Sequence, residues 1–201
     1  MKKIYTFALS LCFASLSQAS LSENYLEQQN YLYFEESFKT EFPTSQDKKN
    51  FLLTKINSGH PIVYWLLANE YSKDVLKSQF VVTDKKLLMF TKQMFYTALV
   101  LTQQDSHFCI EKRPQNASSE LLSKFPQIMD FERKYFDNNL EVMEKSIDFV
   151  NNLPNRKPPN WACLQFGDKM NTSTYGRTYS STDFRLIKEN INKKLINSIK
   201  K

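Results

Sequence analysis

The three cysteines are the residues of this chain whose chemistry is easiest to predict. Cys12 lies in an apolar N-terminal run, whereas Cys109 and Cys163 lie in the middle and later parts of the chain. If the first nineteen residues are removed, as argued below, an even pair remains in an oxidising compartment, where pairs form disulfides. We therefore expect a Cys109–Cys163 disulfide, contributing about 4 kcal/mol in the chain-entropy model. The alternative is that both thiols are free and buried.

The two histidines show none of the spacings that bind a metal. Neither His60 nor His107 has a second histidine four residues away, and the chain contains no H-E-x-x-H and no paired C-x-x-C, the patterns typical of zinc sites. We interpret His60, which precedes Pro61, as a helix-start residue. His107 is either a surface residue or a group that polarises the thiolate of Cys109, which would require a free, accessible thiol. We predict no metal site.

Serine nucleophiles and phosphate-binding loops are not supported either. The chain has no G-x-S-x-G, and its three glycines leave no room for a glycine-rich loop. Acyl transfer by a serine nucleophile and nucleotide binding at such a loop are therefore not expected. We predict no cofactor and assign no catalytic residue of these types.

Glu70 is the one candidate catalytic acid. It lies in a strongly apolar run, where partial burial would raise its pKa and suit it to general acid catalysis by a cell-wall glycosidase. Glu35 and Glu36 form a pair in an earlier helix, but nothing in the sequence supplies the second carboxylate for Glu70. In the simpler interpretation, Glu70 lies on a narrow polar stripe with Asn69 and Lys73.

Tyrosines in polar contexts are candidates for binding a partner protein, because exposed tyrosine is common at protein interfaces. The chain is rich in aromatic residues, with 16 Phe, 10 Tyr and 2 Trp. For Tyr31 and Tyr33, packing of the first helix against the core explains the pattern equally well. The candidate partner-binding residues are Tyr25, Tyr175, Arg177 and Tyr179.

The N-terminus has the layout of a secretory signal peptide. A basic head, Met1-Lys2-Lys3, precedes a mostly apolar run over residues 4–16, and Ser17-Gln18-Ala19 is an A-x-A-like cleavage site. The apolar run is too short to span a bilayer. We predict that residues 1–19 are cleaved off after Ala19 and that the product is periplasmic or secreted. Leu11 before Cys12 does not fit a lipoprotein acylation site, which favours a soluble product over an anchored one.

Net charge and hydropathy limit the classes of molecule that this protein is expected to bind. The formal net charge is +6, and removing Lys2 and Lys3 leaves +4, much of it near the C-terminus. This bias is weaker than that of a typical nucleic-acid binder, so we expect no nucleic acid, while an acidic partner or an anionic membrane surface stays open. No later run approaches 18 apolar residues, so no integral membrane segment is expected after cleavage.

Apolar residues recur at helical spacing through most of the chain, and glycine is scarce, so we predict an all-α fold. Residues 20–201 should form one helical domain, an irregular bundle. Helices are expected over 22–42 and 46–57, from Pro61, from Thr83 or Asp84 to near Asp105, over 120–124 and 127–135, from Asn138, and over 182–199. The last of these is basic and amphipathic. A proline-rich connector at 154–160 and polar loops at 111–119 and 168–181 join them.

Residues 59–105 resemble one degenerate repeat of the Sel1/tetratricopeptide type. Gly59-His60 precedes Tyr64-x-x-Leu67-Ala68-x-x-Tyr71, which is similar to the first-helix pattern, and Phe95-Tyr96-x-Ala98 is similar to the second. The two halves are separated by about 11 more residues than in the family, and no second copy follows. The resemblance implies an antiparallel hairpin at the centre of the domain and a protein-binding scaffold rather than a catalyst.

The whole layout also resembles uncharacterised exported helical proteins of bacteria, some of which are immunity proteins that neutralise toxins from neighbouring cells. We therefore predict an exported, non-catalytic protein-binding protein of the bacterial envelope, either immunity- or inhibitor-like or a scaffold. Its partner would be another envelope protein; the oligomeric state is left open. The alternatives are an envelope hydrolase that uses Glu70, and a secreted factor that acts on a host.

Overall fold

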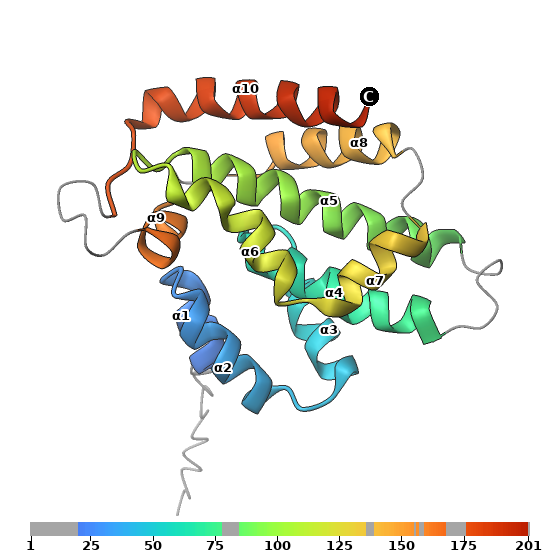
Figure 1. Cartoon of the computed structure of the whole chain (residues 1–201). Coiled ribbons are helices and arrows are strands. Elements are labelled where there is room, and N and C mark those ends of the chain that lie inside the picture. The colour runs from blue at the N-terminus through green and yellow to red at the C-terminus, as the bar shows by residue number, and fades with distance from the viewer. Residues whose placement is uncertain are drawn as a thin grey trace, which may run out of the picture.

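The computed structural model describes residues 20–77, 85–135, 139–154, 156, 159–167 and 176–200. Within these ranges the chain is all-α, as predicted, with no β-strand (Figure 1). The predicted signal peptide, Tyr175 and residues 168–174 of the predicted polar loop lie outside the described residues. The helices are α1 (Leu21–Glu27), α2 (Tyr31–Glu41), α3 (Ser45–Thr54), α4 (Pro61–Lys77), α5 (Lys85–His107), the 3-10 helix η1 (Arg113–Asn116), α6 (Ala117–Ser123), α7 (Pro126–Tyr135), α8 (Leu140–Asn151), α9 (Trp161–Phe166) and α10 (Ser181–Ile199).

Helices α4 and α5 form an antiparallel hairpin at the centre of the molecule (Figure 1). Both are apolar around most of their circumference, so they are stable only when other helices cover them on several sides. Trp65 of α4 shows this burial: its ring stacks 6.1 Å from that of Phe125 and meets Phe95 edge-on. Its indole N–H donates a hydrogen bond of 2.9 Å to the Thr102 hydroxyl of α5, so the only polar atom of the buried ring is satisfied.

The other helices cover the hairpin in different directions. Helices α3 and α7 pack on α4, α8 packs on α5, and α10 lies across α5 and α8. The apolar side of α10 packs against the core through Leu195, Ile196 and Ile199, whereas its basic side faces outward. In the described part of the chain, no helix combines the length and the apolar character needed to cross a membrane.

The prediction of a single helix over residues 22–42 is wrong, because the chain forms two helices there, α1 and α2, that pack on each other. The break lies at Gln28–Asn30, and Gln29 adopts a left-handed conformation with φ of 54°. Reversing the chain here lets Leu26 of α1 and Phe34 and Phe38 of α2 all reach the core. One continuous helix of this length could not turn back to bury both stretches.

Other boundaries also differ from those expected. Ser180, not Ser181 or Thr182, is the N-cap of α10; its side chain accepts the backbone N–H of Asp183 in a capping box. The predicted polar loop at 111–119 contains η1 and the start of α6. The short helix α9 carries Trp161 and Cys163 in a stretch for which no helix was predicted.

Candidate functional site

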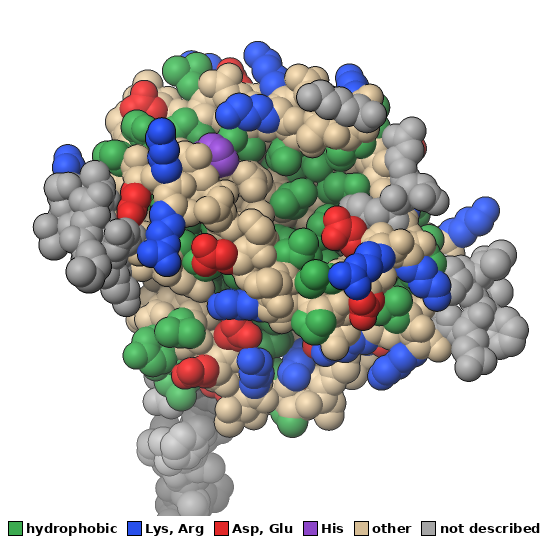
Figure 2. Space-filling model, viewed as in Figure 1, with side chains coloured by type: hydrophobic (Ala, Val, Ile, Leu, Met, Phe, Trp, Pro, Cys, Tyr) green, Lys and Arg blue, Asp and Glu red, His purple; other side chains and the backbone are tan. Residues whose placement is uncertain are grey.

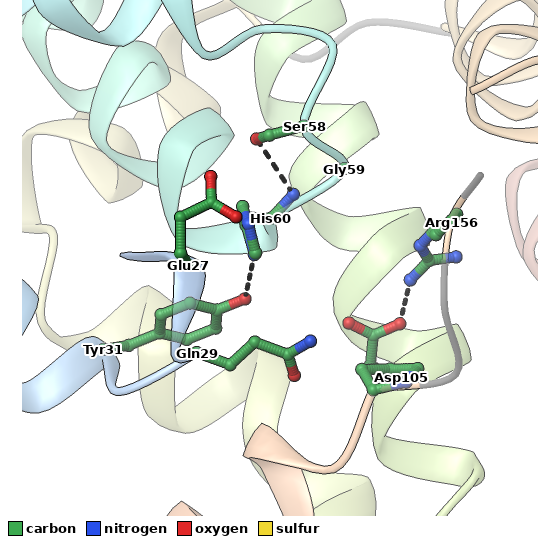
Figure 3. Close-up of a pocket in the computed structure, with 9 residues that line it drawn as sticks. Glu27, Gln29, Tyr31, Ser58, Gly59, His60, Asp105 and Arg156 are labelled. Carbon is green, nitrogen blue, oxygen red and sulfur yellow. Dashed lines mark hydrogen bonds and ion pairs between the residues drawn. The ribbon is translucent and has the colours of Figure 1, made fainter. Parts of the chain in front are cut away.

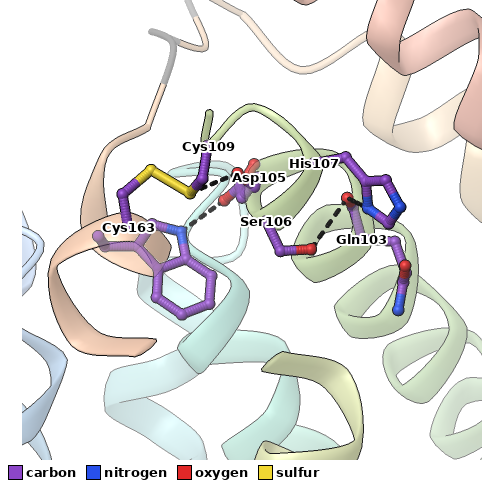
Figure 4. Close-up of a disulfide and its surroundings, with 7 residues drawn as sticks. Gln103, Asp105, Ser106, His107, Cys109 and Cys163 are labelled. Atoms are coloured by element: carbon purple, nitrogen blue, oxygen red, sulfur yellow. Dashed lines mark hydrogen bonds between the residues drawn. A yellow bond between two sulfur atoms is a disulfide. The ribbon is translucent and has the colours of Figure 1, made fainter. Parts of the chain in front are cut away.

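The predicted disulfide is confirmed: Cys109 and Cys163 are bonded, with their Cα atoms 5.4 Å apart. Both cysteines are buried, and the bond joins the segment that follows α5 to α9 (Figure 4). An isolated antiparallel β-bridge between Cys109 and Thr178 also joins this segment to the residues before α10. The disulfide therefore fixes the C-terminal part of the chain to the end of the central hairpin.

Asp105, one turn before Cys109, is the polar centre of this region. Its carboxylate is 1% exposed, and its Oδ2 accepts a hydrogen bond of 2.6 Å from the indole N–H of Trp161. The guanidinium of Arg156 forms an ion pair with Oδ1 and donates a 2.6 Å hydrogen bond to the Gln104 side chain. Burial lowers the pKa of Arg156 to about 10, but the group stays protonated at neutral pH.

A polar cavity of about 220 Å³ lies beside this ion pair, between α1–α2 and the start of α4 (Figure 3). His60 and Tyr31 form its other wall, with the phenol oxygen 3.0 Å from the His60 Nδ1. The side chain of Gln29 points into the space between the two walls, and its Oε1 has no hydrogen-bond partner among the residues that the structure describes. We call this the polar pocket; it is lined by Glu27, Gln29, Tyr31, Ser58, Gly59, His60, Asp105, Arg156 and Pro159.

The electrostatics of the polar pocket do not favour acid–base catalysis. Burial, followed by the nearby charges of Arg156 and Lys55, lowers the pKa of His60 to about 4. The imidazole is therefore neutral near pH 7 and a weak base there. Burial also raises the pKa of Tyr31 above its usual value, and the Ser58 hydroxyl donates to the Lys55 carbonyl oxygen. The Tyr31–His60 hydrogen bond links α2 to the residue before α4, and the Tyr31 ring packs on that of Trp161 in α9 with centroids 5.0 Å apart.

The side chain of Glu70 is buried, at 3% exposed, and each of its carboxylate oxygens has a partner. Lys73 forms a 2.6 Å ion pair with its Oε1, and the Ser45 hydroxyl donates a 2.7 Å hydrogen bond to its Oε2. Glu35 lines the same small cavity as Glu70 and pairs with Lys39 at 3.0 Å. Glu35 and Glu70 therefore line one cavity, which their positions in the sequence did not predict. Each carboxylate already has a lysine partner.

The predicted residue Tyr25 lies on the outer face of α1 and α2. Its ring stacks on that of Tyr33 with centroids 5.5 Å apart, and Tyr33 is 52% exposed. Leu21, 61% exposed, lies beside them. We call this cavity of about 320 Å³ the aromatic pocket; it is lined by Leu21, Tyr25, Tyr33, Glu36, Ser37, Thr40 and Glu41. Figure 2 shows hydrophobic and acidic side chains side by side in this region, at the lower left.

The remaining candidates, Arg177 and Tyr179, lie near the start of α10. Tyr179 is 44% exposed and lines a groove with His107 and Leu186. Arg177 is exposed, and its carbonyl oxygen accepts the backbone N–H of Ile110 at 3.1 Å. Tyr25 and Tyr179 line different cavities, so the sequence-predicted binding residues do not form one site.

Asp105, Arg156 and Trp161, which meet beside the polar pocket, were missed from the sequence. His60 was interpreted only as a helix-start residue, and Tyr31 only as a packing or partner-binding tyrosine. Asp105 carried a usable signal, because it is an acid near the C-terminal end of a largely apolar helix and four residues before a cysteine. Comparisons with models of known protein families, with curated proteins and with solved structures found no match for this chain.

Proposed function

We propose that this protein is an exported, non-catalytic binding protein of the bacterial envelope, of the immunity or inhibitor type, that holds a partner protein on the face formed by α1 and α2. The observation that carries the proposal is the aromatic pocket. Two stacked tyrosines and an exposed leucine surround a cavity that opens at the surface. Exposed tyrosine beside aliphatic side chains is the composition that protein interfaces favour.

The charge of this face indicates what the partner presents. Between Leu21 and Glu41 there are five glutamates and one lysine, a net charge of −4 in a chain whose total is +6. Glu36 and Glu41 line the aromatic pocket. A lysine or arginine side chain would place its aliphatic part against Tyr25 and Tyr33 and its charge near the two glutamates. A cation over a tyrosine ring gains a further attraction of about 0.5–2 kcal/mol.

The face is also held in a fixed shape before any partner arrives. The Glu41 carboxylate accepts the Ser22 backbone N–H at 3.3 Å, which ties the start of α1 to the end of α2. Lys55 of the segment after α3 pairs with Glu23 of α1. A preorganised surface loses less conformational freedom on binding, so more of the contact energy appears as affinity.

The resemblance of α4–α5 to a Sel1/tetratricopeptide hairpin agrees with this proposal, because proteins built from such hairpins bind other proteins. The scaffold role and the immunity role differ only in what the partner does, and both use the same face. A secreted factor that acts on a host would present the same surface to a host protein.

Affinity capture tests the proposal. The chain 20–201 with its disulfide formed is used as bait for periplasmic extracts and for secretions of neighbouring strains, and captured proteins are identified by mass spectrometry. We expect one stoichiometric basic partner, retained by the control variant Leu186→Ser and lost with the double variant Leu21→Ser/Tyr33→Ala. Capture that is unchanged by the double variant, or no capture by folded bait, would contradict the proposal.

A second function, hydrolysis of the cell wall, is favoured by the burial of Glu70 and by Glu35 lining the same cavity. In this alternative the buried Glu70 is the general acid. The variant Glu70→Gln distinguishes the two proposals. If wall-cleaving activity is present in the native chain and disappears in the folded variant, the protein is an enzyme and the non-catalytic proposal fails.

A further inference from the structure

The cavity around Glu70 has features that the binding proposal does not use. It measures about 160 Å³ and lies where four elements meet: α2, α3, α4 and the link between α6 and α7. Figure 2 shows several lysine and arginine side chains over the lower middle of the molecule, interspersed with acidic ones. We call it the lysine pocket; it is lined by Glu35, Phe38, Lys39, Lys48, Leu66, Asn69, Glu70, Lys73, Lys124, Phe125 and Gln127.

The charges around the lysine pocket do not cancel. Lys73 is paired with Glu70 at 2.6 Å, and Lys39 with Glu35 at 3.0 Å. The other two lysines, Lys48 and Lys124, have no carboxylate partner among the described residues. The pocket therefore carries a net charge of +2 from four lysines and two glutamates. Such an arrangement attracts an anion of two charges.

Asn69 supplies a second, independent observation at this pocket. The residue is 8% exposed and lines the pocket, yet its side-chain Oδ1 is buried without a hydrogen-bond partner among the described residues. Leaving a buried polar atom unpaired destabilises the folded state. A half-turn of the amide would replace Oδ1 by the Nδ2 donor. An anion in the pocket would then accept a hydrogen bond from Asn69.

We propose that the lysine pocket binds a phosphomonoester group on a small polyol or sugar. The cations of this pocket are all lysines, which contact phosphate oxygens as separate point charges. The apolar side chains of Phe38, Leu66 and Phe125 line the rest of the pocket and would contact the carbons next to the ester oxygen. This site is separate from the aromatic pocket, so neither proposal depends on the other.

Glycerol 3-phosphate is the probe that we would titrate into the folded, oxidised chain 20–201, with binding followed by calorimetry and by NMR shifts. We expect saturable binding, with glycerol and acetate giving none. The double variant Lys48→Gln/Lys124→Gln should weaken binding by about tenfold or more, since two charge-assisted contacts are lost. The control variant Lys193→Gln/Lys200→Gln removes the same number of lysines from α10 and its C-cap and should change binding less than about twofold.

The outcomes separate the possibilities. Absence of saturable binding both to glycerol 3-phosphate and to vesicles that contain phosphatidic acid overturns the proposal. Equal weakening in the two double variants also overturns it, because only general charge attraction would then operate. Vesicles of phosphatidylcholine with and without phosphatidic acid form a second arm. Binding to the phosphatidic acid vesicles alone, lost with Lys48→Gln/Lys124→Gln, would support the site and assign its phosphate to a lipid headgroup.

Discussion

At the scale of single residues, Asp105 connects three parts of the chain that are far apart in sequence. It lies at the end of α5, accepts a hydrogen bond from Trp161 of α9 and pairs with Arg156 of the connector before it. Both members of the ion pair are buried, with side chains 1% and 8% exposed. A buried pair adds little net stability by itself, but removing one partner leaves an uncompensated charge.

We therefore predict that Asp105→Ala lowers the free energy of unfolding by about 3–5 kcal/mol, because Arg156 and the Trp161 indole would lose their acceptor. The exposed pair of Arg185 and Glu189 on α10 serves as the control; Glu189→Ala should cost less than about 0.5 kcal/mol. Urea unfolding measures both. Equal, small effects of the two substitutions would mean that the buried pair is not important for stability.

His60 should make stability depend on pH. Its pKa is lowered from 6.5 to about 4 in the folded chain, so the folded state binds the proton less well than the unfolded state. The neutral form contributes its full stability above pH 6.5, and this contribution is lost as the pH falls toward 4, by about 3 kcal/mol in total. Unfolding curves between pH 7 and 4 should show a smaller loss for His60→Asn than for the native chain. His107, whose pKa burial also lowers, remains in both proteins, so parallel curves would disprove the assignment to His60.

The polar pocket shows why such residues escape prediction from sequence. His60 does precede the helix that starts at Pro61, as expected, but its phenol partner Tyr31 lies 29 residues earlier. Asp105 and Trp161 are 56 residues apart. These contacts depend on how the helices cross, and no local pattern carries that information. Glu70 is intermediate: its apolar surroundings suggested burial, but its contact with Ser45 did not follow from spacing.

At the scale of elements, the α4–α5 hairpin was the easiest part to predict. Both helices are apolar around most of their surface and have clear start signals, so their type and adjacency follow from sequence. The break between α1 and α2 was not predictable, since Gln28, Gln29 and Asn30 contain neither glycine nor proline. The break exists because Leu26 and Phe34 must both reach the core, which is a tertiary requirement that local propensity does not express.

Gln29 should therefore be a position where substitution stabilises the protein. Its φ of 54° is unfavourable for a residue with a side chain, and its Oε1 is buried without a partner in the described part of the chain. Glycine relieves both penalties but makes the unfolded chain more flexible, so we expect Gln29→Gly to raise the free energy of unfolding by about 0.5–1 kcal/mol. The neighbouring Gln28 has a right-handed backbone, so Gln28→Gly should not stabilise. Thermal unfolding of the two variants compares them directly, and a destabilised Gln29→Gly would show that the Gln29 side chain makes a contribution larger than its strain.

At the scale of the whole molecule, the disulfide and the charge distribution were both visible in the sequence. The pairing of Cys109 with Cys163 followed from counting cysteines, and the acidic α1–α2 segment and basic α10 can be counted directly. The pockets could not be predicted, because each combines residues from several helices. The lysine pocket, for example, needs α2, α3, α4 and the α6–α7 link in one place.

Loss of the disulfide should reduce stability without removing the helical hairpin. The bond joins residues 54 positions apart, and native disulfides of this kind contribute about 2–4 kcal/mol. The double variant Cys109→Ala/Cys163→Ala should therefore unfold at lower urea concentration while its helical circular dichroism is retained. Adding a reductant should shift the native chain and leave the double variant unchanged. If the reductant has no effect on the native chain, the bond contributes nothing to folding stability.

The same bond gives the chain a covalent ring. Residues 110–162, which include η1 and helices α6, α7 and α8, lie between the two bonded cysteines. A protease that cuts once within this ring therefore cannot release a fragment, because both pieces stay attached through sulfur. Where proteases are present, a nicked molecule would keep its α1–α2 face joined to the rest of the protein. A nicked sample should run as one band on a non-reducing gel and as two bands after reduction.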